Sequence, residues 1–149
     1  MVLIILLGCW NFAALRSIYR ICQKKYVLFD DRFTMTLCMN TAMITSFVFA
    51  LYVSFLFPSF QVASIMLGLG IGWKFGTVLK NPAILTGLYN GAMGGIMGTM
   101  LGVVLKNPAL CNIPIESDAM IAANMYSLSL FAAGLHTLVM GLIRYSFTV

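Results

Sequence analysis

The sequence predicts an all-α, polytopic membrane bundle of about five transmembrane helices. Three observations predict this class. Of the 149 residues, 61% are hydrophobic and only 9% are charged, the mean hydropathy is +0.97, and the apolar residues form stretches of about 20, the length that crosses a bilayer. We therefore expect residues 1–149 to form one integral membrane domain whose main partner is the lipid bilayer.

The first two helices are expected at about 1–19 and 33–57, on either side of a basic segment at 16–32. The first apolar run has no basic residue before it, which is the reverse of a cleavable secretory signal and favours a retained helix. The uncharged part of this helix ends at Leu15, so Arg16 and Arg20 must extend toward the membrane surface.

The third, fourth and fifth helices are expected at about 61–79, 83–105 and 119–143. The third and the fourth each end at a repeated phrase, GTVLKNPA at 76–83 and GVVLKNPA at 102–109. Lysine favours a helix C-terminus, and Asn-Pro disfavours continuation of the helix. Duplication of a helix-plus-stop cassette and a one-helix inverted repeat both explain the repetition.

Positive charge predicts the orientation of the bundle. Five of the nine basic residues lie in the segment 16–32, which the positive-inside rule places in the cytoplasm, with the N-terminus outside and the C-terminus inside. Lys106 is the one exception on the outer side. Because the cations cluster in one connection, they indicate topology and no nucleic-acid partner.

Glycines predict close helix packing. Five glycines of the fourth helix fall within one arc of about 80°, and the third helix carries glycines at every fourth position. Small residues at this spacing let two backbones approach closely, so we expect a Gly-zipper helix pair. The partner of the fourth helix is either the third helix or a second copy of the fourth across an oligomer axis. The glycines are Gly68, Gly72 and Gly76, and Gly87, Gly91, Gly94, Gly98 and Gly102.

Methionines and a few polar residues share faces with small residues on three helices. If these faces converge, they form a pathway, since an intramembrane amide or imidazole needs a partner or water. Methionine is also an adaptable filler beside glycine, and a lone histidine is often a hydrogen-bonded interior residue. The pathway candidates are Thr86, Asn90, Met93 and Met97, then Met35, Met39 and Met43, and finally His136 and Met140.

Two resemblances bear on function. Met35-xxx-Met39 followed by GxxxG in the next helix resembles the copper transporter family, whose pore is formed by a trimer of three-helix subunits. This resemblance implies that Met35 and Met39 are ion-pathway candidates. The stretch GLYNGAMGGIMGTMLG at 87–102, with the preceding Met-spaced helix, is similar to a group of small uncharacterised Gly- and Met-rich membrane proteins of Gram-positive bacteria, which implies a bacterial plasma membrane.

Soft-metal binding is therefore one hypothesis. Thioether sulfur selects Cu(I), and the metal-ligand candidates are Met35, Met39, His136 and Met140. An enzyme is not expected, because one histidine and four acidic residues, all outside the expected spans, offer no catalytic constellation. The four cysteines form no CxxC motif and indicate no disulfide framework.

Three functions follow. The first is an oligomeric channel or transporter component, with a soft metal cation as one substrate. The second is a non-catalytic subunit that stabilises a larger membrane complex through its glycine faces. The third is a membrane sensor or accessory factor that acts through the basic segment. Lys74, the one cation inside an expected span, either extends to the surface or faces a cavity.

Overall fold

The chain forms five long α-helices in a computed structural model that describes residues 2–25, 30–79, 81–111 and 118–147. Helix α1 spans Val2–Lys25, α2 spans Asp31–Leu56, α3 spans Gln61–Leu79, α4 spans Asn81–Lys106 and α5 spans Asp118–Ser146; a short 3-10 helix, η2, covers Pro108–Cys111. No strand occurs in the described residues. The predicted all-α class is confirmed for this part of the chain.

All five α-helices are long and apolar enough to cross a bilayer, which indicates a multi-pass membrane protein. The bounds of α3 are those expected, whereas α1 continues past residue 19 to Lys25. Arg16, Arg20 and Lys24 thus lie on a helix and not in a connecting segment. Arginine, lysine and glutamine are good helix formers, which accounts for the longer α1.

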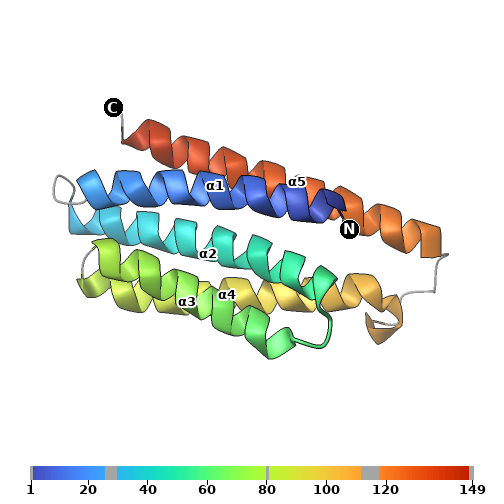
Figure 1. Cartoon of the computed structure of the whole chain (residues 1–149). Coiled ribbons are helices and arrows are strands. Elements are labelled where there is room, and N and C mark those ends of the chain that lie inside the picture. Colours follow the sequence, from blue (N-terminus) through green and yellow to red (C-terminus); the bar gives the residue numbers. More distant parts are fainter. Residues whose placement is uncertain (1, 26–29, 80, 112–117, 148–149) are drawn as a thin grey trace.

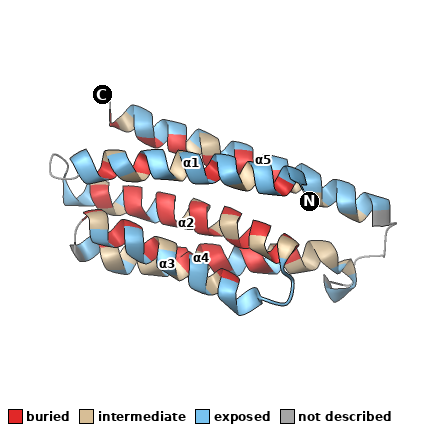
Figure 2. Ribbon diagram, viewed as in Figure 1, coloured by how far each residue is buried: buried red, intermediate tan, exposed pale blue. Residues whose placement is uncertain are grey.

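The helices lie side by side, with α2 between the α1 and α5 pair and the α3 and α4 pair (Figure 1). Helices α1, α3 and α5 run in one direction and α2 and α4 in the other. We call the end at which α1, α3 and α5 finish the basic end, and the opposite end the distal end. Buried residues follow α2 along most of its length, whereas much of α1 and α5 is exposed (Figure 2).

Packing divides the bundle into two parts. Helices α2, α3 and α4 make the most extensive contacts, and we call them the three-helix unit. Helices α1 and α5 pack on each other and touch the three-helix unit more sparsely, and we call them the outer pair. The bundle therefore combines a tightly packed part with a loosely attached one.

Glycines occupy the α3–α4 contact. A Cβ atom on Gly68 would lie 2.5 Å from the carbonyl oxygen of Gly91, and one on Gly72 would lie 2.7 Å from the carbonyl carbon of Gly87. A Cβ atom on Gly76 would lie 2.5 Å from the Cα atom of Ile84. Because these neighbours are backbone atoms that cannot rotate away, only glycine allows this approach.

The other glycines of α4 face α2. A Cβ atom on Gly98 would lie 3.1 Å from the Cβ atom of Ala50, and one on Gly102 would lie 2.6 Å from the hydroxyl oxygen of Ser54. Gly94 lies against the backbone of Met43. The glycine arc that the sequence predicts on α4 thus contacts two helices, α3 at one edge and α2 at the other. Small residues along the arc let both backbones come close to α4.

The two Lys-Asn-Pro copies have different structural roles. In the first, α3 ends at Leu79 and α4 begins at Asn81, so Pro82 lies in the first helical turn, where its missing N–H is tolerated. In the second, α4 ends at Lys106, whose Nζ donates a hydrogen bond to the carbonyl oxygen of Phe55 in the last turn of α2 (2.7 Å). Lys106 thereby satisfies a helix-end carbonyl of its neighbour.

Candidate functional site

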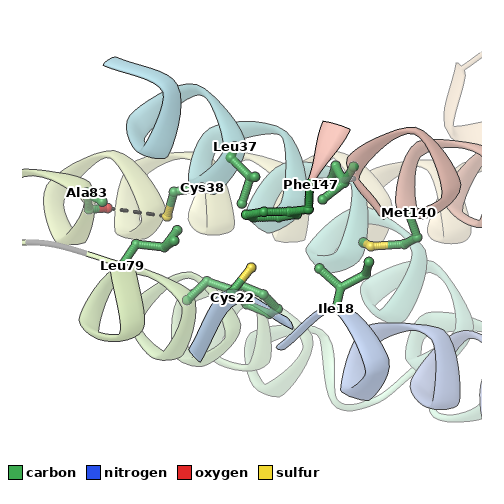
Figure 3. Close-up of a cluster of buried hydrophobic side chains, with 10 residues drawn as sticks. Ile18, Cys22, Leu37, Cys38, Leu79, Ala83, Met140 and Phe147 are labelled. Carbon is green, nitrogen blue, oxygen red and sulfur yellow. Dashed lines mark hydrogen bonds between the residues drawn. The ribbon is translucent and has the colours of Figure 1, made fainter. Parts of the chain in front are cut away.

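A group of buried polar side chains lies between and beside two apolar clusters. The cluster toward the basic end includes Ile18, Cys22, Leu37 and Met140 (Figure 3). The cluster toward the distal end includes Ile4, Val48, Leu51, Phe55 and Ala132. Asn11 on α1, Thr45 on α2 and His136 on α5 each lie between the two clusters along their helix, whereas Tyr52 and Ser129 lie at the distal cluster. We call these the polar layer: Asn11, Thr45, Tyr52, Ser129 and His136.

Hydrogen bonds join the polar layer across three helices. The Nδ2 of Asn11 on α1 donates to the Tyr52 hydroxyl on α2 (3.1 Å). That hydroxyl donates in turn to the backbone carbonyl oxygen of Ser129 on α5 (3.2 Å). Nearby, Thr45 Oγ1 of α2 lies 3.4 Å from Nε2 of His136 on α5. The polar layer is therefore the main polar link between the outer pair and α2.

Two atoms of the polar layer lack a hydrogen-bond partner among the described residues. These are Asn11 Oδ1 and His136 Nδ1, and both side chains are 0% exposed. Leaving a buried polar atom unpaired costs free energy, so such atoms are rare in folded proteins and often mark functional positions. When Nε2 of His136 carries the ring proton and donates to Thr45, Nδ1 offers a free lone pair.

Met140 is the one methionine candidate in the apolar interior at 3% exposure, four residues after His136 on the same helix. Met39 and Met97 lie at the surface of the bundle, with 43% and 45% of their surface exposed. Met35 is half-buried. The methionine faces of α2, α4 and α5 thus do not meet at one closed point in this conformation.

One groove brings two predicted residues together. Met43 of α2 and Met97 of α4 both line a groove of about 550 Å³ between α2, α4 and α5. Its lining is mostly apolar and includes the polar residues Asn40 and Thr36. The groove lies outside the polar layer, because His136 does not line it.

The polar candidates of α4 bond within their own helix. Asn90 is 7% exposed, and its Nδ2 donates to the carbonyl oxygen of Thr86 (2.8 Å). Thr86 donates to the carbonyl oxygen of Pro82 (3.5 Å), and Met93 is half-buried beside them. These bonds give each of the two side chains a hydrogen-bond partner within α4.

Sequence reasoning singled out His136 but not Asn11, Thr45 or Tyr52. A usable signal was present for Asn11, since it is the only amide in the apolar run from Val2 to Leu15. Thr45 and Tyr52 gave no such signal, because threonine and tyrosine are common in membrane helices and their partners lie far away in the sequence.

The chemistry of the polar layer is that of neutral donor atoms. An amide oxygen, an imidazole nitrogen and hydroxyl groups lie there, with no acidic residue in the layer. Within the described residues, no three or more His, Cys, Asp or Glu side chains gather as they would around a metal ion. Comparisons with protein-family models, curated proteins and solved structures give no significant match to this chain.

Proposed function

We propose that the protein is a component of a membrane transport pathway for a small cation, with the polar layer as its transit site. The observation that carries this proposal is the fully buried His136, whose Nδ1 has no partner among the described residues. Ionisable side chains inside membrane spans are costly, and they are found where ions or protons pass.

The division of the bundle supports the same proposal. Transporters place their sites near the middle of the membrane, between two bodies that rock against each other. Here the polar layer joins the outer pair to α2, which belongs to the glycine-packed three-helix unit. Movement of the outer pair would open the polar layer without disturbing the close α3–α4 contact.

The donor set favours a soft monovalent cation. Neutral nitrogen, oxygen and thioether groups cannot offset the hydration of a divalent ion in an apolar interior. Imidazole suits copper, and thioether selects Cu(I). His136 and Met140 share a helix face at i and i+4 and are both buried. Met35 and Met39 would serve as an approach from the more exposed side of α2.

Uptake into vesicles tests this function. Vesicles that contain the purified chain should take up Cu(I), kept reduced by ascorbate, faster than protein-free vesicles and faster than they take up K⁺. His136→Leu should lower Cu(I) uptake by about tenfold or more, since the loss of a donor worth about 1.4 kcal/mol lowers binding tenfold. Met100→Leu is the control, because Met100 is 63% exposed. Equal uptake by His136→Leu and the unaltered chain would refute the proposal.

A second candidate, a subunit that assembles with copies of itself or with another membrane protein, is favoured by two glycines of α5. Apart from the adjacent residues and the backbone of α5 itself, a Cβ atom on Gly134 or Gly141 would have no described heavy atom within 4 Å. Glycine weakens a helix, and among the described residues no close contact offsets that cost at these positions. The mass of the complex in mild detergent separates the candidates, since a foreign protein at fixed stoichiometry would favour assembly.

The finer topology belongs to the same proposal. The basic end carries Arg20, Lys24 and Arg32, so the positive-inside rule favours a cytoplasmic position for it. The resemblance to Gly- and Met-rich proteins of Gram-positive bacteria implies that the membrane is a bacterial plasma membrane. The N-terminus would then lie outside and the C-terminus inside. The Gly68, Gly72 and Gly76 face against α4 would act as the Gly-zipper pair that keeps the three-helix unit rigid.

A further inference from the structure

A groove between α1 and α3 combines an apolar half with a cationic half. It encloses about 740 Å³. Toward the distal end it is lined by Phe12, Leu15, Met66, Leu67 and Gly70, and toward the basic end by Arg16, Arg20 and Lys74. Apart from the adjacent residues and the backbone of α3 itself, a Cβ atom on Gly70 would have no described heavy atom within 4 Å, so the wall of the groove is open there.

The cations of this groove have no counter-charge in the described part of the chain. Arg16, Arg20 and Lys74 are exposed, and their charged groups make no hydrogen bond or ion pair with any described residue. No acidic side chain lines the groove. A second basic hollow lies on the other side of α1, where Arg16 and Arg20 meet Lys24 and Arg144.

The position of Arg16 within the span limits how its charge can be stabilised. Arg16 lies inside the candidate membrane span Val2–Lys24, eight residues before its end. At 1.5 Å per residue this places Arg16 about 12 Å along the helix from Lys24. Arg16 therefore stands at a depth where a cation is stable only if its side chain reaches the surface or a headgroup is drawn inward.

We propose that the α1–α3 groove binds an anionic phospholipid. The phosphate lies between Arg16, Arg20 and Lys74, and an acyl chain runs along Phe12, Leu67 and Gly70 toward the middle of the membrane. The cationic half of the groove would meet the phosphate at the membrane surface, and the apolar half would meet the acyl chain deeper in the bilayer. The groove thus presents charge and apolar surface in the same order as a phospholipid does. Basic pockets between membrane helices bind anionic headgroups in this way. The inference does not depend on the transport function.

Tryptophan fluorescence tests the proposal directly. The chain has two tryptophans, and Trp10→Phe leaves Trp73, which is 59% exposed and precedes Lys74 in α3. In bilayers of phosphatidylcholine with a fixed fraction of brominated lipid, brominated phosphatidylglycerol should quench Trp73 more strongly than brominated phosphatidylcholine. One basic residue near the membrane surface strengthens the binding of anionic lipid roughly fivefold. We therefore expect the site beside Trp73 to bind phosphatidylglycerol at least roughly fivefold more strongly than phosphatidylcholine.

Substitutions decide which cations are responsible. The triple variant Arg16→Gln, Arg20→Gln, Lys74→Gln should lose the preference, whereas Lys74→Arg should keep it because the charge is retained. Arg32→Gln is the matched control, since Arg32 is exposed near the basic end but lines neither basic hollow. Equal quenching by the two lipids, or a preference that survives in the triple variant, would overturn the proposal. Displacement of the brominated lipid by millimolar inorganic phosphate would assign the groove to a free anion instead.

Discussion

At the residue scale, Tyr52 is the point at which three membrane helices meet. Its hydroxyl accepts a hydrogen bond from Asn11 and donates one to the carbonyl oxygen of Ser129. Tyr52 is 3% exposed, and its ring packs in the distal apolar cluster. One side chain therefore both fills the core and satisfies a buried amide.

This double role predicts a specific pattern of stabilities. Tyr52→Phe should lower the free energy of unfolding by about 1–2 kcal/mol, because the Asn11 amide is left without its partner. Adding Asn11→Leu should recover most of that loss, since removing both partners leaves no unpaired polar group. Unfolding of both variants in mixed micelles measures the difference. The single variant Asn11→Leu completes the comparison. If the double variant is destabilised by the sum of the losses in Tyr52→Phe and Asn11→Leu, the Asn11–Tyr52 bond does not link α1 to α2.

The histidine and its surroundings show what sequence reasoning can find. His136 is conspicuous, because it is the only histidine and lies inside an apolar span. Its partner Thr45 is 91 positions away, and no local spacing relates the two. Residue type thus predicted one member of the polar layer, while its other members depended on how α1, α2 and α5 pack.

At the scale of elements, α3 carries two glycines in opposite environments. Gly72 lies against the backbone of Gly87, whereas a Cβ atom on Gly70 would meet no described heavy atom within 4 Å apart from its neighbours and the backbone of α3 itself. Both are one methyl group from alanine and lie two residues apart on the same helix. The two positions can therefore be compared directly: close packing requires glycine at position 72 but not at position 70.

Alanine at each position should therefore have opposite effects. Gly72→Ala should destabilise the bundle by about 1–3 kcal/mol, because its methyl group would meet backbone atoms of α4 and force α3 and α4 apart. Gly70→Ala should be neutral or stabilise by up to about 1 kcal/mol, since alanine is the better helix former. Denaturant titration of the two variants measures both effects. Similar stabilities would contradict the close α3–α4 approach.

The elements themselves were largely predictable. Apolar stretches of about 20 residues predicted all five helices, and the predicted bounds of α3 agree with the observed Gln61–Leu79. The end of α1 was not predictable from charge, because Arg16, Arg20 and Lys24 mark a topological connection and are also good helix formers. Which edge of the α4 glycine arc faces α2 and which faces α3 required the packed structure.

At the scale of the whole molecule, the bundle consists of a glycine-packed three-helix unit and a sparsely attached outer pair. The polar layer lies where the outer pair meets α2, and it is closed here because its side chains are buried. A transport function requires that this contact opens, while the contacts inside the three-helix unit stay closed. Two adjacent residues of α2 distinguish these contacts: Thr45 lies beside His136 of α5, and Ser46 donates to the carbonyl oxygen of Gly68 in α3.

Thiol accessibility at these two positions is the most direct test. The test uses a chain whose four cysteines are replaced by alanine and whose helical content is retained. Thr45→Cys and Ser46→Cys then each place one thiol at a position that is 0% exposed, and the two positions are adjacent in α2. A membrane-impermeant maleimide should label Thr45→Cys from both sides of the membrane, and it should leave Ser46→Cys unlabelled. Protection of both thiols from both sides would contradict the account and leave the polar layer as a purely structural link between helices.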